Sequence, residues 1–245
     1  MPDKEEDTFC KKMRKATREI HTISDTLVNA KLAFAFLDDS VWADGLLVFY
    51  EIFRYLEGAM IRLKNTKIGL LPLSDLQRTD AFEKDLDHYL GKSWIKDYSP
   101  RDSVIKYLMR LREVEDTDPT LLMAYIYHLY MGLLSGGNVL RKKRQYMQSI
   151  LPLKKVKTGG NSVLDFGNSS IFELKRNLCD TMNKIAETLD EDTRNKLIEE
   201  SKIVFELNNE IIRSVRGAGT IMIKKLLYFI IAPILIIFVF YILLK

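Results

Sequence analysis

An uninterrupted apolar run near the end of the chain constrains the protein more than any other feature. Nineteen residues without a charge, from Leu226 to Leu244, lie between Lys225 and the terminal Lys245. As an α-helix this run spans roughly 28 Å, close to the thickness of the hydrocarbon core of a bilayer. A buried core helix is the alternative, but such helices seldom run so long without a polar face. The run therefore predicts a transmembrane helix, inside a C-terminal membrane anchor that we assign to residues 218–245.

The start of the chain predicts where the rest of it lies. Residues 1–8 form a polar tail, and the first ten residues contain no apolar stretch that could act as a signal peptide. Lys224 and Lys225 precede the apolar run, in agreement with the positive-inside tendency. The two cysteines, Cys10 and Cys179, fit a reducing compartment rather than a disulfide framework. We therefore expect a domain that faces the cytosol and is held to a membrane by its C-terminus.

The charge balance excludes one class of partner. The chain carries a net charge of +4, of which three units come from lysines at positions 224–245, so the remainder is close to +1. A domain so near to neutral is not a general binder of nucleic acids or of acidic membrane surfaces. We expect no nucleic-acid partner.

Helical periodicity dominates the soluble part of the chain. The first apolar stripe has members three or four residues apart, from Phe9 through Met13 and Ile20 to Leu27. No run alternates with the period of a strand for long, so residues 9–217 predict a single all-α domain of six to eight helices. The later helices are expected at about Trp42–Lys64, Asp75–Tyr89, Arg101–Glu115, Asp118–Leu140, Ile171–Leu189 and Asp192–Arg216.

One segment departs from this pattern. Residues 151–170 (LPLKKVKTGGNSVLDFGNSS) are rich in glycine, serine and asparagine. Such a composition favours a loop. We interpret the segment as a loop within the domain and not as a domain boundary.

The histidines are few enough to be weighed one by one. His21 lies beside the apolar stripe of the first helix, and Asp25 follows one turn later, where a carboxylate can orient a histidine that ligates a metal. A lone histidine near an apolar face is more often a core or surface residue, so both interpretations stay open. His88 and His128 have no carboxylate one turn further on, and we assign them no ligand role.

Three glycines fall within six positions of the long apolar helix. Gly132, Gly136 and Gly137 each cost about 1 kcal/mol relative to alanine in a helix interior. A helix end or kink would explain them, and so would a flat ligand that approaches the backbone closely. The letters LSGG also occur in the signature of ABC transporter ATPases, but the chain contains no G-x-x-x-x-G-K-[ST] phosphate loop.

Basic residues give a weaker signal. Arg14 and Arg18 are one turn apart on the helix that carries His21, and Lys175 lies on the helix after the loop. Such side chains can hold carboxylate or phosphate groups, although they more often form a solvated face.

Together these features resemble the haem oxygenase family. The resemblance starts at residues 15–21 (KATREIH), which look like the helix that supplies the proximal ligand. It is strongest at residues 121–143 (LLMAYIYHLYMGLLSGGNVLRKK), which resemble the glycine-rich distal helix of the family. The other matching stretches are 81–86 (AFEKDL), 107–114 (YLMRLREV) and 198–208 (IEESKIVFELN). The resemblance implies an all-α, haem oxygenase-like multi-helical domain followed by one C-terminal transmembrane helix.

The resemblance also implies a site and a reaction. Haem, both substrate and cofactor, would lie between the first helix and the glycine-bearing helix, with His21 as the iron ligand and Asp25 as its partner. Gly132 and Gly136 would let the distal backbone approach the ring and leave room for oxygen. The same resemblance places Tyr127, Phe205, Arg14, Arg18 and Lys175 around the haem, the three basic residues at its propionates and Tyr127 ordering water.

The implied reaction needs a redox partner. In this family NADPH-cytochrome P450 reductase delivers the electrons, and haem is opened to biliverdin with release of carbon monoxide and ferrous iron. The habit of the family, together with the short anchor, favours the endoplasmic reticulum membrane.

The sequence departs from the family pattern on the distal side. Leu133 stands where the family typically has an aspartate that holds a water chain, and Leu129 stands where it has an arginine. Phe53 aligns with a supporting tyrosine, and Cys179 with a basic residue that helps to orient the haem. These differences predict slow or less regioselective turnover.

Two other functions are compatible with parts of the sequence. A haem-binding sensor or carrier without turnover would explain Leu133. A tail-anchored interaction module of the Bcl-2 kind would explain the anchor, but no BH-type groove motif is present. Our leading hypothesis is a haem oxygenase.

Overall fold

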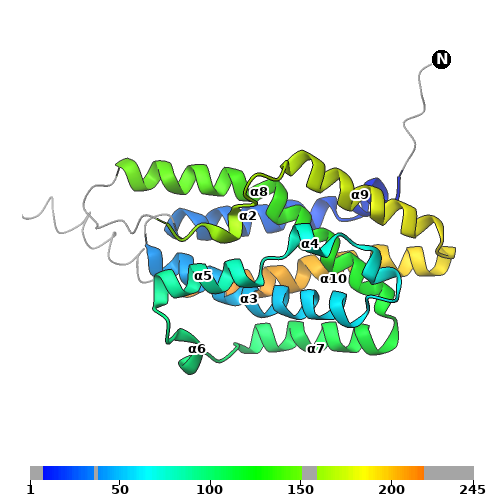
Figure 1. The fold of residues 1–245 in the computed structure, drawn as a ribbon, viewed down its shortest axis with the longest axis horizontal. Helices are drawn as coiled ribbons and strands as arrows, with labels where there is room; N and C mark the ends of the chain where they lie inside the picture. Colours follow the sequence, from blue (N-terminus) through cyan, green and yellow to red (C-terminus); the bar gives the residue numbers. More distant parts are fainter. Residues whose placement is uncertain (1–7, 36–37, 151–158, 218–245) are drawn as a thin grey trace, which may run out of the picture.

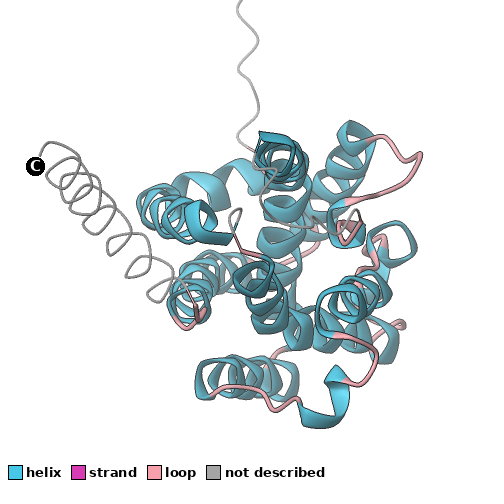
Figure 2. Ribbon diagram, turned by 90° about the vertical axis from the view of Figure 1, so that its left-hand side faces the viewer, coloured by secondary structure: helices cyan, strands magenta, loops and turns pink. Residues whose placement is uncertain are grey.

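The computed structural model describes residues 8–35, 38–150 and 159–217, and within these ranges all regular structure is helical (Figures 1 and 2). This confirms the predicted all-α class. The α-helices are α1 Phe9–Ala16, α2 Arg18–Ala35, α3 Asp39–Arg62, α4 Leu73–Leu76, α5 Thr79–Leu90, α6 Trp94–Asp97, α7 Asp102–Thr117, α8 Leu122–Ile150, α9 Ile171–Glu187 and α10 Glu191–Arg213. The 3₁₀ turns are η1 Lys67–Leu70, η2 Pro119–Leu121 and η3 Ser162–Leu164.

The first half of α8 is the centre of the core. Its residues from Leu122 to Tyr130 are all buried, and the helix packs against α9 and α10. A helix that is apolar all round is expected to be surrounded by other elements. Figure 1 shows α8 running along the molecule beside α9 and close to α10.

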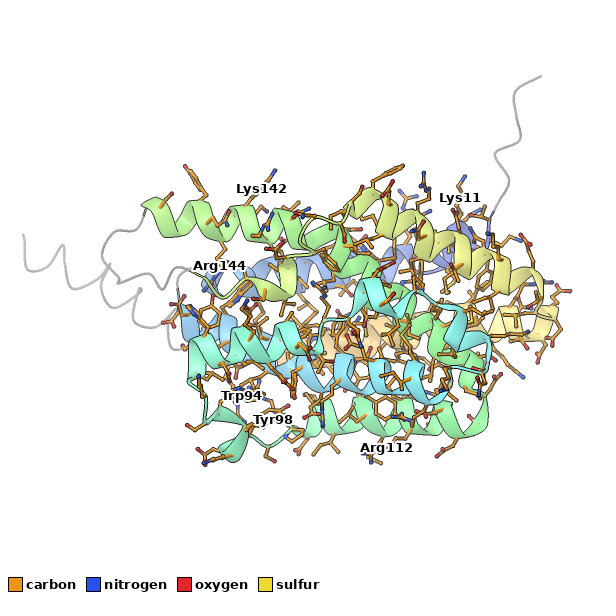
Figure 3. All side chains as sticks on the ribbon, in the orientation of Figure 1. Lys11, Trp94, Tyr98, Arg112, Lys142 and Arg144 are labelled. Carbon is orange, nitrogen blue, oxygen red and sulfur yellow. The ribbon has the colours of Figure 1, made fainter. Side chains whose placement is uncertain are left out.

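The far end of α8 extends beyond the prediction. We expected it to end near Leu140, but it continues to Ile150. Arg144 is fully buried, points inward from α8 (Figure 3), and its Nη2 atom lies 2.6 Å from Asp39 Oδ1. Its guanidinium also stacks 4.5 Å from the centre of the Trp42 ring. These contacts to α3 stabilise the last turns of α8, although the sequence there is rich in basic residues.

The N-terminus of α5 is capped by a side chain from α3. The buried Glu57 carboxylate accepts hydrogen bonds from the backbone N–H groups of Arg78, at 2.5 Å, and Thr79, at 3.2 Å. It also accepts a bond of 2.9 Å from the hydroxyl of Tyr130 in α8. One carboxylate thus satisfies free donors of a helix end and ties three helices together.

The predicted first helix is divided into two. The Thr17 hydroxyl donates to the Met13 carbonyl at 2.9 Å, and α1 ends just before this residue. A side-chain bond of this kind competes with the helical pattern and bends helices. The apolar stripe consequently does not remain on one buried face, because Met13 is fully buried whereas Ile23 in α2 is 54% exposed.

The described part of the predicted loop is held firmly to α5. The Asp85 carboxylate accepts hydrogen bonds from the N–H groups of Ser162 and Val163 at 2.8 and 2.9 Å. Leu164 packs against Gly137 of α8. Residues 151–158 of this loop lie outside the described residues.

The predicted anchor and most of the polar tail cannot be compared with the structure. Residues 1–7 and 218–245 lie outside the described ranges. Within those ranges, no helix has both the length and the apolarity needed to cross a membrane.

Candidate functional site

His21 is displayed on the surface of α2. Its side chain is 55% exposed, and its Nδ1 atom lies 3.0 Å from Asp25 Oδ2 one turn later. An imidazole whose Nδ1–H is held by a carboxylate presents Nε2 as the atom that can bind a metal. The pair therefore has the geometry of a metal-ligating histidine and its orienting partner.

Phe205 of α10 connects His21 to the long helix α8. Its ring lies edge-on to His21 with centroids 5.4 Å apart, and edge-on to His128 of α8 at 4.9 Å. Residues from α2, α10 and α8 are thus brought together around one aromatic ring.

The same face of α8 carries the two glycines. His128, Gly132 and Gly136 are spaced by four residues, so they lie on one side of the helix. A Cβ atom built at Gly132 or Gly136 would meet nothing within 4 Å, whereas one at Gly137 would touch Leu164 at 3.4 Å. Since His128 faces Phe205, the open backbone of this face is turned toward the side of the molecule that carries His21.

His128 is buried next to this open face. Its side chain is only 9% exposed, and its Nε2 atom has no hydrogen-bond partner among the residues described. Burial, with a smaller contribution from the charge of His21, lowers the pKa of His128 to about 3. The imidazole is therefore neutral at physiological pH.

Tyr127 is directed toward the junction of α1 and α9. It is 1% exposed, and its hydroxyl makes no hydrogen bond of ordinary geometry to a described atom, although it lies beside the Cys10 thiol of α1. Burial raises the pKa of Tyr127 far above its usual value. The hydroxyl therefore stays protonated.

The three predicted basic residues come from three helices. Arg14 lies on α1, Arg18 is the first residue of α2, and Lys175 lies in the first turns of α9. None of them forms an ion pair with a residue that the structure describes. Arg14 lies at the junction of α1 and α9, because its charge acts on both Cys10 and Cys179.

The distal positions are apolar in the structure as in the sequence. Leu129 is 6% exposed and Leu133 is half-buried against the core. Phe53 packs between Phe82 and Tyr130, with ring centroids 5.1 and 5.2 Å away. The Tyr130 hydroxyl donates to Glu57. Since Leu129 and Leu133 are apolar, these positions of α8 place no ionised group at the open face.

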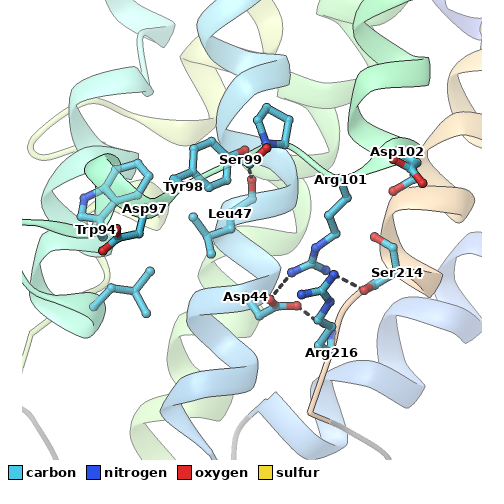
Figure 4. Close-up of a pocket in the computed structure, with 13 residues that line it drawn as sticks. Asp44, Leu47, Trp94, Asp97, Tyr98, Ser99, Arg101, Asp102, Ser214 and Arg216 are labelled. Atoms are coloured by element: carbon cyan, nitrogen blue, oxygen red, sulfur yellow. Dashed lines mark hydrogen bonds and ion pairs between the residues drawn. The ribbon is translucent and has the colours of Figure 1, made fainter.

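A surface cavity of about 800 Å³ lies elsewhere, between α3, α6, α7 and the end of α10 (Figure 4). Its lining includes Asp44, Arg101 and Ser214, with Arg101 bonded to both of the others. No histidine or cysteine lines it. We therefore place the candidate site at the face formed by α2, α8 and α10.

Sequence reasoning overlooked His128. It was assigned no role because no carboxylate follows it by one turn. Its position four residues before Gly132 is the signal that could have found it, since this spacing puts both on one helical face.

Comparisons with known proteins cover nearly the whole described chain. The heme oxygenase family model matches residues 7–214. Heme oxygenase 1 of Homo sapiens is 31% identical over 220 residues, which are 86% of this chain and 72% of the human protein. Heme oxygenase 2 of Synechocystis sp. is 27% identical over 209 residues, which are 83% of this chain and 81% of that protein.

The fold is similar to solved structures as well. The structure of heme oxygenase-2 from Synechocystis sp. PCC 6803 in complex with heme and NO superposes with a TM-score of 0.73. The two chains are 27% identical, and the match covers 85% of each.

Proposed function

The chain belongs to the haem oxygenase family, and from that premise we propose that it opens haem to biliverdin, carbon monoxide and ferrous iron with electrons from an NADPH-dependent reductase. The observation that carries this proposal is the open glycine face of α8, turned toward the exposed His21–Asp25 pair. The first lets a flat macrocycle approach the backbone, and the second offers a ligand to a central metal.

The residues present fit haem. The backbone at Gly132 and Gly136 is open to the approach of a flat ring, because added Cβ atoms would meet nothing within 4 Å. A solvent-accessible imidazole can ligate iron, and cations on three helices can pair with the two propionates. Bound haem supplies the iron that binds oxygen and the porphyrin that is opened.

His21 would hold the iron through Nε2, and Asp25 would fix the orientation of the imidazole. The carboxylate accepts the Nδ1–H proton at 3.0 Å, which selects the tautomer and raises the basicity of the ligating nitrogen. The Phe205 ring packs edge-on against His21 and limits the rotation of the imidazole.

Arg14, Arg18 and Lys175 hold the carboxylate end of the ligand. Arginine and lysine form charge-assisted hydrogen bonds with carboxylates. Because these residues come from α1, α2 and α9, binding of the ligand also joins three helices.

Apolar groups limit the access of water on the distal side. Leu129 and Leu133 exclude water from α8, while Tyr127 Oη keeps its proton beside Cys10. No carboxylate is present at position 133 to hold a chain of water molecules. We therefore propose that turnover is slow or gives a mixture of biliverdin isomers.

The reaction takes place at a membrane in this proposal. Residues 218–245 anchor the chain to the endoplasmic reticulum with the helical domain in the cytosol, where NADPH-cytochrome P450 reductase can reach it. The length of the uncharged apolar run and the lysines that flank it support this assignment.

A haem-binding sensor or carrier without turnover is the second candidate. The observation that favours it is the apolar character of Leu129, Leu133 and Phe53, which leaves the distal side without an ionised group.

One experiment separates these functions. The full chain is loaded with haem and supplied with NADPH and cytochrome P450 reductase, and its absorption spectrum is followed. Loss of the Soret band with growth of a biliverdin band supports the oxygenase, and chromatography of the product reports the isomer. A haem spectrum that persists under reductant and oxygen supports the sensor or carrier. No haem binding at all overturns both.

A further inference from the structure

The two cysteines of the chain meet where α1 crosses α9. Cys10 Sγ lies 3.7 Å from the carbonyl oxygen of Cys179, and the backbone N–H of Cys10 donates to Asn183 Oδ1 at 3.0 Å. Cys10 is buried, whereas Cys179 is partly exposed. Both are free thiols, although 169 positions separate them in the sequence.

The two thiols have different pKa values. A hydrogen bond from the Cys10 thiol, assisted by the charge of Arg14 and by Tyr127, lowers the pKa of Cys179 to about 7, against the opposing effects of burial and Asp180. The same bond, together with burial, raises the pKa of Cys10 far above its usual value. The accessible sulfur is therefore partly thiolate, and the buried one is a thiol.

We propose that Cys10 and Cys179 form a peroxide-reactive dithiol, in which Cys179 is the attacking sulfur and Cys10 the resolving sulfur of an intramolecular disulfide between α1 and α9. An accessible thiolate beside a second cysteine is the arrangement that redox-sensing cysteines share. Nothing in the proposed haem chemistry uses either sulfur.

The chemistry balances with hydrogen peroxide as the oxidant. The Cys179 thiolate attacks one peroxide oxygen, the O–O bond breaks, and a sulfenic acid and one water form once the leaving hydroxide takes a proton. The Cys10 sulfur then attacks the sulfenic sulfur, an S–S bond of about 2 Å forms, and a second water leaves. Two thiols and one peroxide give one disulfide and two waters.

The disulfide would also affect haem binding, and this part of the inference rests on the proposed function. It would join the helix of Arg14 to the helix of Lys175, two of the residues proposed to hold the propionates. Oxidation would thus fix the spacing of this edge of the site and change the affinity for haem.

The test uses the full chain without haem, so that its failure leaves the proposed function intact. The reduced protein is treated with hydrogen peroxide, its remaining thiols are alkylated, and the intact mass and the digested peptides are measured. We expect loss of both thiols in a monomer, a mass lower by two hydrogens, and a cross-linked pair of peptides that contain Cys10 and Cys179. The rate should rise with pH and reach half its maximum near pH 7.

Two variants complete the test. Cys10→Ser should still react at Cys179 but end in sulfinic or sulfonic acid instead of a disulfide, and Cys179→Ser should react at least tenfold more slowly. Disulfide-linked dimers in place of the internal bridge would overturn the proposal. Wild-type chains that lose no thiols, or that accumulate over-oxidised Cys179, would overturn it as well.

Discussion

The buried charges of the helical core have hydrogen-bond partners within the protein, whereas polar groups of the candidate site lack them or face solvent. In the core, Glu57, Asp85 and Glu200 are each less than 5% exposed, and each accepts at least two hydrogen bonds. In the site, His128 Nε2 has no partner among the described residues, and His21 is open to solvent.

This difference is consistent with a core organised for stability and a site that can receive a ligand. A buried polar atom without a partner costs about 1–3 kcal/mol, so a fold keeps few of them unless they serve another purpose. The core satisfies its charges within the protein. In the site, an imidazole, the open backbone at Gly132 and Gly136, and three cations that form no ion pair with a described residue face a different environment. Four substitutions or conditions test this contrast, and they are ranked by their expected effect on the free energy of unfolding.

The largest loss of stability is expected from Glu200→Ala. Glu200 is 4% exposed, receives two hydrogen bonds from Arg110, at 3.0 and 2.6 Å, and accepts another from Tyr125. Removal of one partner of a buried ion pair leaves the rest unsatisfied, and we expect a loss of about 3 kcal/mol in urea denaturation. Glu113→Ala is the matched control, because Glu113 pairs with the same Arg110 but is 61% exposed. It should cost less than about 1 kcal/mol, and equal losses in both variants would contradict the distinction.

The next effect is a pH dependence caused by His128. Its pKa is about 3 in the folded protein and 6.5 in a free histidine, so the unfolded chain binds a proton below pH 6.5 that the folded chain excludes. The stability contributed by this group is therefore complete above pH 6.5 and is lost as the pH falls toward 3. From pH 6.5 to 5 we expect a loss of about 2 kcal/mol.

The variant His128→Phe isolates this contribution. Denaturation of the variant between pH 5 and 7 should show a stability profile flatter than that of the wild type by this amount. Two parallel profiles would mean that His128 takes up a proton without unfolding the chain.

A gain in stability is expected from Gly132→Ala. Alanine is favoured over glycine in a helix by about 1 kcal/mol, and the added methyl group meets no atom within 4 Å. The same methyl group would occupy the space assigned to the ring, so haem should bind more weakly while the protein becomes more stable. Gly137→Ala, on a different face of α8, should show a comparable change in unfolding without the loss in a haem titration. Unchanged haem affinity in Gly132→Ala would remove this face from the site.

The smallest effect on folding is expected from His21→Ala, although its effect on haem should be complete. The side chain is 55% exposed, and a substitution at such a position changes stability by no more than about 0.5 kcal/mol. Absorption spectra of the haem-loaded variant should lack the Soret band of a histidine complex. Thr26→Ala, also exposed on α2, is the control and should keep it. A wild-type spectrum in His21→Ala would refute the assignment of the ligand.

The sequence predicted the fold wherever packing follows the apolar pattern. The helices α3, α9 and α10 lie within a few residues of their expected limits, because buried apolar residues recur along the whole length of each. Two departures have a local cause. The break at Thr17 depends on a hydroxyl that bonds to the preceding turn, and the extension of α8 depends on Arg144, whose burial against Asp39 and Trp42 no periodicity reveals.

The site was predictable in part for the same reason. His21 and Asp25 were found because a spacing of four places them on one helical face, and the structure puts their atoms 3.0 Å apart. The pairing of Cys10 with Cys179 and the contact of His128 with Phe205 were not found. Both join helices far apart in the sequence, and such contacts depend on how the helices cross rather than on any local spacing.

The end of α10 has a mechanical consequence. Arg101, the residue before α7, donates hydrogen bonds to Asp44 of α3 and to the carbonyl oxygen of Ser214 (Figure 4). The backbone N–H of Arg216 donates to the same Asp44 at 2.6 Å. Lys31 of α2 adds a bond of 2.8 Å to the carbonyl of Val215. A pulling force applied beyond Gly217 would therefore load α2, α3 and α7 in parallel before it could peel α10 from the bundle. If a bilayer holds the segment that follows, as we propose, a pull on this tether is shared by three helices before α10 can separate from the bundle.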